Sequence, residues 1–398
     1  MEKYTPIVDA SGLVGSLYDQ ITGKTGITKV DDTNIVQIGN ELKQYPVEGI
    51  FSSICYKIGK TLIQNKAFKG KFMNLYHDSW EFGEILETLR VRPIKAVADP
   101  SMKPVNGTRY DQDTYYSRDV VEKLYTDGID FQYTWWKPND QLWTSFKSME
   151  TLSRFMSALD LTITNSLTVD LMALAKNAVA NYIAQVVNKE FADVSDGNYS
   201  TKSGKQAINV LKLWNDKHPN DKLTKDNCRD NPEYLKHLVK NFMNYTDYLK
   251  DVSATFNIDG EDEQVISDED LNFVILSSYA NDIKVNMQSD TYHKDLVALP
   301  NYETVAFWQG SGGTYDADSV SDIHVGIKNP SDPTQTKDIH FPGVVAVMFD
   351  KDAVGITCEH RKTTAHYNAN LDQTQLFAKY YAQYVNKFDR NFVVFFEA

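Results

Sequence analysis

The chain has 398 residues, more than one simple domain needs, and 42% of them are hydrophobic and 24% charged, as in ordinary globular proteins. These values exclude wholesale disorder and collagen-like repetition. The formal charge of −13 argues against a protein that binds nucleic acid phosphates over most of its surface. An aromatic content of 12% suits large buried contacts, within the chain or between chains.

Apolar runs and cysteines restrict the cellular setting. No apolar run lies at the N-terminus, so we expect no secretory signal. The longest apolar runs, 344–349 and 392–396, are far shorter than the ~18 residues that cross a bilayer. Three isolated cysteines, Cys55, Cys228 and Cys358, predict no disulfide framework and favour assembly in a reducing cytoplasm.

Residues 1–84 are predicted to be an N-terminal arm with short helices. Glycines punctuate the first 50 residues, and their hydrophobic periodicity is weak. We therefore expect an extended arm with little core of its own, ordered by lying on something else.

Residues 85–142 are predicted to form an extended β-hairpin loop. Leu89 and Val91 alternate with arginines, and a returning strand places Phe131, Tyr133 and Trp135 on one face. A polar tip that begins at Arg109 and Tyr110 separates the two strands. Because a two-stranded ribbon is marginal in water, its aromatic face needs cover from another part of the chain or from a neighbouring molecule.

Residues 143–196 give the strongest helix signal, within the segment 143–204 that is predicted to hold a spine helix. No glycine or proline occurs between Pro138 and Gly197, and apolar residues recur at steps of three and four from Leu152 to Val186. Ser148 is the expected N-cap. About 43 helical residues at ~1.5 Å each would span roughly 65 Å, which predicts a rigid spine.

Residues 205–340 are predicted to form a compact unit of helices and strands. Asn231 and Pro232 are the expected cap and first residue of a helix. A buried strand is expected at 271–276 and a weak helix at 282–297, and the glycine-, serine- and aspartate-rich stretch 310–333 predicts loops.

Residues 341–398 are predicted to be rich in strands. An apolar strand at 344–349 ends in a turn at 350–352, and apolar alternation runs from Phe377 to Val385. A polar turn then leads to a last strand at 392–396. The chain as a whole is thus predicted to be α+β, with no internal repeat.

The sequence contains no catalytic, cofactor-binding or metal-binding constellation that predicts a site. Two Gly-Lys-Thr stretches lack the first glycine of a phosphate loop, and the histidines are scattered without metal-ligand spacing. Adjacent Trp135 and Trp136 suit stacking on sugars, but such residues on a ribbon more often anchor packing or an interface. We therefore expect neither catalysis nor a cofactor.

The order of elements and several stretches resemble the major capsid (major head) proteins of tailed bacteriophages, which share the Hong Kong 97 fold. The stretches are similar to those of the phi-29-like small short-tailed phages, and the resemblance covers about residues 85–398. They are 131–135 with 142–146 at the ribbon-to-helix junction, 270–276 at the buried strand, and 349–353, 377–381 and 392–395 near the C-terminus.

The resemblance implies a self-assembling capsid protein. Residues 143–204 would be the spine helix of a peripheral domain, 205–340 an axial domain, and 341–398 the C-terminal strands of the peripheral domain. Copies would form the pentamers and hexamers of an icosahedral-type shell around double-stranded DNA, with no sequence-specific DNA binding and no membrane. Scaffolding and portal proteins are expected partners, the virion is the expected location, and the host bacterial cytoplasm is the expected site of assembly.

The resemblance also implies which residues contact a neighbouring subunit. The ribbon would reach over the adjacent copy, and its expected contact residues are Phe131, Tyr133, Trp135, Trp136, Arg109 and Tyr110. Two other functions stay open at this point: another virion structural protein, of the tail or connector, and a carbohydrate-active enzyme, which the acidic and tryptophan-containing surface would suit. Particle shape would distinguish the first, and release of sugar from glycans the second.

Overall fold

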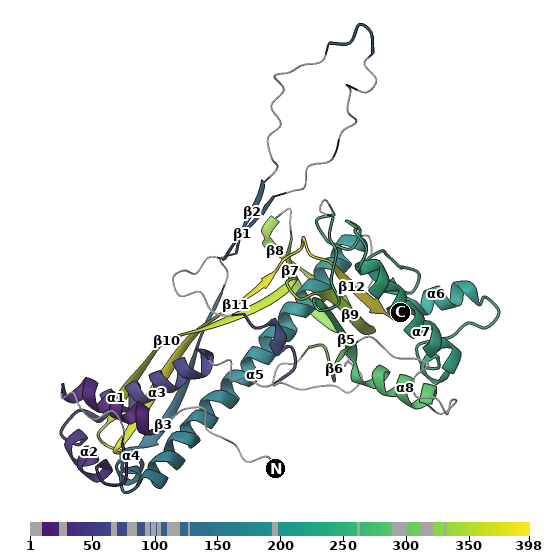
Figure 1. The fold of residues 1–398 in the computed structure, drawn as a ribbon. Helices are drawn as coiled ribbons and strands as arrows, with labels where there is room; N and C mark the ends of the chain where they lie inside the picture. Colours follow the sequence, from purple (N-terminus) through teal and green to yellow (C-terminus); the bar gives the residue numbers. More distant parts are fainter. Residues whose placement is uncertain are drawn as a thin grey trace. The chain divides into compact units, whose positions relative to one another are not determined.

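The structure is a computed structural model (Figure 1) that describes residues 10–23, 30–64, 70–77, 86–91, 96, 101, 105–109, 120–125, 128–192, 198–260, 263–288, 301–309, 321–329 and 332–398. The chain divides into two units. The larger comprises Met1–Ser79 and Gly128–Ala398, and the smaller comprises Trp80–Asp127.

The N-terminal part of the larger unit forms helices, as predicted, but they have a buried core, so the prediction of an extended arm with little core of its own is wrong. It forms α1 (Ala10–Thr22), α2 (Ile35–Leu42) and α3 (Val47–Gln64). Leu17, Ile38 and Ile54 in these helices are at most 1% exposed. The glycines misled the prediction because tertiary packing overrides their low helix propensity. At Gly39 a Cβ would lie 2.6 Å from Phe146, so the absence of a side chain there permits close approach.

The predicted hairpin pairs differently from the expectation. Strand β1 (Leu86–Val91) pairs antiparallel with β2 (Val120–Tyr125), and these two strands lie in the smaller unit. The aromatic strand β3 (Ile129–Pro138) pairs instead with β11 (Gln373–Asn386) in the larger unit. The prediction that 85–142 form one hairpin loop is therefore wrong in its strand pairing. Strand alternation shows which face is apolar but does not identify the partner strand.

Helix α5 (Met149–Glu190) confirms the predicted spine helix, with 42 residues in one uninterrupted element after the short α4 (Asn139–Ser145). The Ser148 hydroxyl accepts a hydrogen bond from the Thr151 amide at 3.3 Å, and the Thr151 hydroxyl accepts one from the Ser148 amide at 3.2 Å. This reciprocal pair satisfies two amides that the first turn leaves unbonded. From Ala178 to Val187 almost every residue is buried, so this half of the helix is a core element.

A three-stranded antiparallel sheet in the order β10-β11-β3 packs against α3 and α5. Strand β10 (Val354–Asn368) was not predicted, because its second half is polar and half-exposed and has no strict alternation. Figure 1 shows α5 running beside this sheet, from the N-terminal helices to the second sheet.

A five-stranded sheet in the order β4-β12-β9-β5-β6 forms the other core. Its strands are β4 (Ala207–Asn209), β5 (Leu271–Leu276), β6 (Glu303–Val305), β9 (Val344–Asp350) and β12 (Phe392–Phe396). The predicted strands at 271–276 and 392–396 are confirmed, but 341–398 supplies strands to both sheets instead of to one domain.

Three helices and a hairpin complete this region. The helices are α6 (Val210–Lys217), α7 (Pro232–Leu249) and α8 (Ser277–Gln288), with the short turns η1 (Met73–Leu75) and η3 (Cys228–Asp230). Asn231 caps α7 as predicted, accepting bonds from the Glu233 and Tyr234 amides. The stretch 310–333, predicted to be loops, contains all of β7 (Ile323–Asn329) and the start of β8 (Asp332–Phe341), while 310–320 lies outside the described residues.

Helix α5 is, by length and composition alone, long and apolar enough to cross a membrane, with a mean hydropathy of 1.2 over 18 residues. Core helices of proteins without a membrane span show the same length and composition. The side chains of Leu167, Leu171 and Ala178 are buried in the same apolar core as the sheet strands. This packing indicates a core helix.

Candidate functional site

The aromatic face of β3 packs against the chain itself. Phe131, Tyr133 and Trp135 alternate along the strand and are half-buried against the core. The Phe131 ring stacks on Tyr380 of β11, with 5.7 Å between ring centroids. The residues alone left open whether another part of the chain or a neighbouring molecule covers this face. The structure shows that α5 of the same chain contacts it, while β11 pairs beside β3 in the sheet. A contact from their accessible parts to another copy stays a prediction.

Tyr133 also ties β3 to α5. Its hydroxyl donates to the Ser166 carbonyl at 3.2 Å and to the Asp170 carboxylate. Burial, and then the bond to Asp170, raises the pKa of Tyr133. The phenol therefore keeps its proton and remains a donor, which fastens the sheet to the middle of the spine helix.

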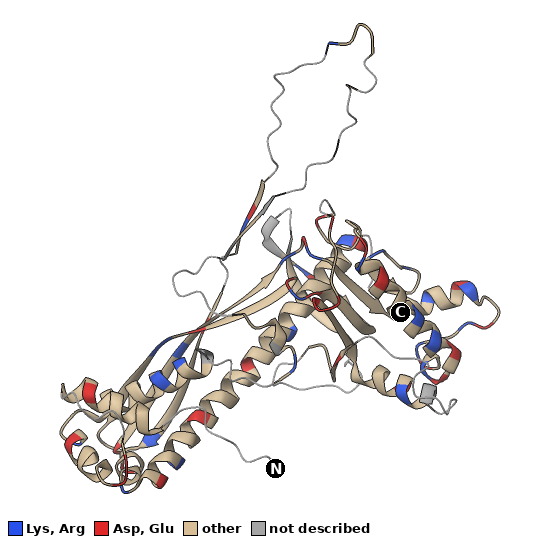
Figure 2. Ribbon diagram, in the orientation of Figure 1, with Lys and Arg blue, Asp and Glu red and all other residues tan. Residues whose placement is uncertain are grey.

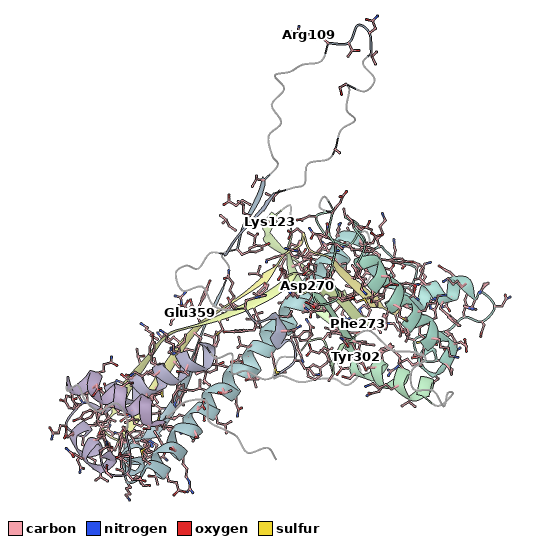
Figure 3. The ribbon with its side chains drawn as sticks, viewed as in Figure 1. Arg109, Lys123, Asp270, Phe273, Tyr302 and Glu359 are labelled. Atoms are coloured by element: carbon pink, nitrogen blue, oxygen red, sulfur yellow. The ribbon has the colours of Figure 1, made fainter. Side chains whose placement is uncertain are left out.

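The other predicted contact residues lie in three different places. Trp136 projects from the opposite face of β3 and is 45% exposed. Arg109 is exposed in the smaller unit, where Figure 3 labels it. Tyr110 lies outside the described residues.

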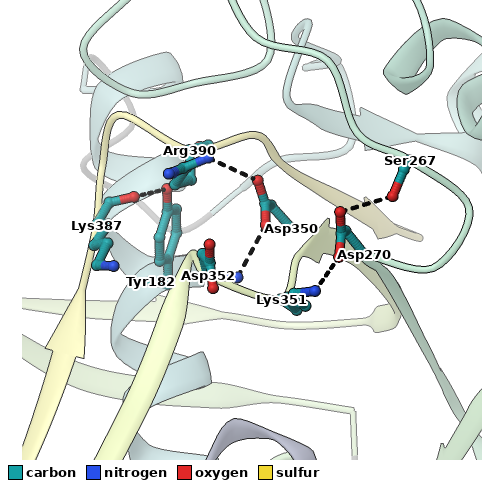
Figure 4. Close-up of polar contacts among 8 residues, drawn as sticks. All are labelled: Tyr182, Ser267, Asp270, Asp350, Lys351, Asp352, Lys387 and Arg390. Carbon is teal, nitrogen blue, oxygen red and sulfur yellow. Dashed lines mark hydrogen bonds and ion pairs between the residues drawn. The ribbon is translucent and has the colours of Figure 1, made fainter. Parts of the chain in front are cut away.

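A polar junction fixes the point where the chain passes from one sheet to the other (Figure 4). The Tyr182 hydroxyl of α5 lies 3.0 Å from each of two carbonyls, those of Lys387 and Arg390, and donates to them. Its ring stacks on Phe392 at 4.1 Å between centroids. Because residues 387–391 connect β11 of the first sheet to β12 of the second, Tyr182 anchors both sheets to one helix.

Charged residues extend this junction to the start of β5. Arg390 Nη1 lies 3.3 Å from the buried Asp350 carboxylate, and the Asp352 amide donates to the same carboxylate at 2.9 Å. Burial raises the pKa of Asp350. Lys351 pairs with Asp270 at the surface, where such an ion pair contributes ~1 kcal/mol or less. The sequence predicted the turns but did not show that they meet.

Glu397 forms a buried polar cluster that sequence reasoning missed. Its carboxylate is 1% exposed and accepts hydrogen bonds from the hydroxyls of Tyr234 at 2.6 Å and Tyr279 at 2.5 Å, and from the Cys228 thiol at 3.4 Å. The donors lie on α7, α8 and η3, so Glu397 ties all three to the end of β12. Burial raises the pKa of Glu397 although the tyrosine bonds oppose the shift. A lone acid directly after five apolar strand residues was the available signal.

We expect Glu397→Gln to remove part of the pH dependence of stability. Burial raises the pKa of Glu397 above 4.5, so the folded chain binds this proton more tightly than the unfolded chain does. The stabilisation is therefore complete below about pH 4.5 and is lost as the pH rises through the folded-state pKa. Over that window the wild-type free energy of unfolding should fall by up to ~1.4 kcal/mol per pH unit more steeply than that of the variant.

Urea unfolding from mildly acidic to neutral pH measures this difference. The control is Glu233→Gln, since the Glu233 side chain is 70% exposed and should leave the pH profile unchanged. Parallel profiles for the wild type and Glu397→Gln would show that the carboxylate is not responsible.

The β1–β2 ribbon presents an exposed apolar face. Leu89 lies directly opposite Glu122, and Val120 and Leu124 lie two positions either side of Glu122, so all four share one face. Leu89, Val120 and Leu124 are 64%, 48% and 57% exposed. Contiguous apolar side chains that stay exposed are typical of interaction surfaces.

The described residues contain no group of three or more His, Cys, Asp or Glu side chains placed to hold a metal ion. A cavity of about 340 Å³ lies at the α4–α5 corner, lined by Asp140, Gln141, Thr144, Ser145, Thr151 and Phe155. Its hydroxyls already bond within the corner, since Ser145 donates to the Leu142 carbonyl and Thr151 to the Ser145 carbonyl. These hydrogen bonds stabilise the turn between α4 and α5, which is a structural role.

Comparisons with solved structures indicate the fold. The capsid of Staphylococcus phage Andhra shares 12% identity over 83% of this chain and 85% of that chain, with a TM-score of 0.50. A bacteriophage P68 structure shares 10% identity over 83% and 85%, with a TM-score of 0.46. The capsid of cyanophage P-SCSP1u shares 11% over 83% and 89%, with a TM-score of 0.43. The likeness to the Andhra capsid indicates the α+β Hong Kong 97 fold expected from the sequence.

Comparison of the sequence with models of protein families then identifies the family of this chain. None of the curated proteins matches this chain. The model of the Phi29-like phage major capsid protein family matches residues 16–396, which is nearly the whole chain and includes both sheets and the spine helix. The chain therefore belongs to the Phi29-like phage major capsid protein family, and it is a structural protein of the virion that self-assembles into the shell.

Proposed function

We propose that copies of this chain associate into pentamers and hexamers that close into an icosahedral-type head around double-stranded DNA. The observation that carries the proposal is the exposed apolar face of the β1–β2 ribbon. A closed shell of one repeated subunit needs contacts between different surfaces of neighbouring copies. A neighbouring copy that covers Leu89, Val120 and Leu124 would remove their apolar area from water and so stabilise the assembly.

In this proposal the two sheets serve two domains joined by α5. The three-stranded sheet and the N-terminal helices form the peripheral domain, and the five-stranded sheet with α6, α7 and α8 forms the axial domain near the ring centre. The contacts of Tyr182 support this division into two domains, because they bind the segment that connects the two sheets to one point on α5.

Charge and cysteine chemistry support the remaining parts of the proposal. A net charge of −13 suits a container that holds DNA without sequence-specific binding, since tight phosphate binding would hinder packaging and ejection. All three cysteines are buried thiols, which fits assembly in the host cytoplasm. Scaffolding and portal proteins would be partners, and the chain would carry out no catalysis.

Replacing Leu124 with aspartate is expected to leave the subunit folded and to abolish shells. The side chain is more than half exposed, so the change costs the subunit less than ~0.5 kcal/mol, as at most surface positions. In an assembled ribbon contact, however, the new carboxylate would be buried without a partner, which costs several kcal/mol per copy. Negative-stain microscopy and sedimentation of the expressed full chain measure the outcome.

The control for this experiment is Glu122→Gln on the same ribbon face, which keeps the apolar residues and should still form shells. Normal shells from Leu124→Asp would refute the ribbon contact. A wild-type chain that remains a compact monomer at high concentration would refute the assembly itself.

A further inference from the structure

The outer face of the three-stranded sheet carries two lysines directly opposite each other. Lys362 of β10 and Lys379 of β11 are register partners, and both side chains are exposed. Like charges in directly opposed positions destabilise a sheet. Within the described part of the chain neither lysine has an ion pair or a side-chain hydrogen bond. The free subunit therefore holds these two like charges opposite each other without a direct ion pair to either from a described residue.

An apolar side chain lies beside this lysine pair. Phe377 is two positions from Lys379 on the same face of β11 and is half-buried. Gln132 of β3 lies directly opposite Lys379, so Lys362, Lys379 and Gln132 form one row across the three strands. The nearest carboxylates on this face, Asp130 and Glu359, lie directly opposite Tyr381 on its two sides, in the row next to the lysines. Arg361 is 3.7 Å from Asp130 and competes with the lysines for that acid. We call Lys362, Lys379, Phe377 and Gln132 the basic sheet face.

A surface of opposite charge follows α7. Residues 247–270 contain nine acidic residues and one lysine. Ser253 and Gln264 join by two backbone hydrogen bonds of 3.0 Å, which places Val252 beside Val265, and these valines are 63% and 55% exposed. Glu263 and Glu269 are exposed nearby, with no ion pair or side-chain hydrogen bond to any described residue.

The two surfaces occur on different elements of the larger unit. We call Val252, Val265, Glu263 and Glu269 the acidic patch. Figure 2 shows basic residues in blue on the strands of the three-stranded sheet and acidic residues in red in loops beside the five-stranded sheet. Each surface combines charge with exposed or half-exposed apolar area, and their charges are opposite.

We propose that the acidic patch of one copy docks on the basic sheet face of the next copy. The glutamates would neutralise the opposed lysines, and Val252 and Val265 would pack on Phe377. The inference rests on the proposed function, because it supplies a second contact within the same shell. Two different surfaces that meet make a head-to-tail contact, which closes into a ring when the rotation between copies divides a full turn. Complementary charge also rejects wrongly oriented neighbours, since like charges would then face each other.

The first test separates subunit stability from assembly. Lys362→Glu places an acid opposite Lys379, so the melting temperature of the isolated subunit should stay the same or rise. Assembly should nevertheless weaken, with the concentration needed for half-maximal shell formation rising roughly tenfold, the change that 1.4 kcal/mol produces. A residue with a purely structural role would not give this opposite pair of effects.

The second test exchanges the charges. The double variants Lys362→Glu/Lys379→Glu and Glu263→Lys/Glu269→Lys should each assemble poorly, because like charges would face each other. Combining all four changes in one chain should restore assembly to near the wild-type level. The matched control is Lys217→Glu/Lys222→Glu, which reverses two exposed lysines in and beside α6 and should assemble normally.

Each outcome decides between the possibilities. Shells from the wild type and from both double variants would overturn this inference and leave the proposed function standing. Loss of assembly in both without rescue in the fourfold variant would also overturn it, because it would show that the two surfaces do not bind each other. A wild type that forms no shells would overturn the proposed function itself.

Discussion

The variant Leu171→Pro is expected not to fold. Leu171 lies near the middle of α5 and is 1% exposed. Proline there would remove the amide that bonds to the Leu167 carbonyl and would clash with that carbonyl, at a cost of about 3 kcal/mol or more. Loss of the buried leucine adds further to this cost. Since domains are stable by only about 5–15 kcal/mol, the total approaches the whole margin.

Solubility, circular dichroism and thermal unfolding of the expressed chain measure this effect. The control is Leu171→Met, a volume-conserving change that should cost less than ~1.5 kcal/mol and keep a cooperative transition. A proline variant with the wild-type melting temperature would show that α5 is not the continuous core helix on which both sheets pack.

Replacing Gly343 with valine is expected to have the second largest effect. Gly343 has φ +77°, where a residue with a Cβ loses roughly 1–2 kcal/mol. A Cβ there would also lie 2.0 Å from the backbone carbonyl oxygen of Glu397, so β9 and the end of β12 would have to separate. The Glu397 amide donates to the Gly343 carbonyl at 2.9 Å, and that bond would be lost too.

We expect Gly343→Val to lower the free energy of unfolding by at least ~3 kcal/mol, a loss typical of strained and overpacked sites. Urea unfolding measures it. The control is Gly49→Ala in α3, where a Cβ meets nothing within 4 Å and alanine should be neutral or stabilise the helix by up to ~1 kcal/mol. Equal stability of both variants would contradict this explanation.

Local sequence patterns predicted the elements that carry their own signal. Helix α5 was predicted because its apolar side chains repeat at helical spacing and Ser148 caps its first turn. The cap at Asn231 and the apolar strands β5 and β12 were predicted for the same kind of reason. Each depends on residues that are near neighbours in the chain, so the pattern is visible in a short window.

Elements that depend on distant residues were predicted poorly. The aromatic strand β3 was assigned to a hairpin with its sequence neighbour, but β11, more than 230 residues later, is its partner. Short helices were predicted in the N-terminal part, but the buried core of α1 to α3 was not, because their glycines suggest breaks unless the packing surface is known. Strand β10 was missed since half of it carries no apolar alternation.

The residues of the candidate contact surfaces also divide into those that local sequence patterns predicted and those that only the tertiary structure revealed. Sequence reasoning identified the aromatic residues of β3 but not that Tyr380 of β11 and helix α5 contact them. It did not identify Glu397 or Tyr182, because their partners lie far away in the chain. It did not identify the lysine pair at 362 and 379, because that pair depends on the register of two strands.

By itself the sequence determined that this chain is an α+β protein with a long spine helix, and the order of its elements pointed to a phage capsid protein. Tertiary structure alone decided which strands pair, where the chain crosses between its sheets, and which side chains stay exposed. The physical reason is that helix formation depends on contacts within a few residues, whereas strand pairing and burial depend on contacts between residues hundreds of positions apart.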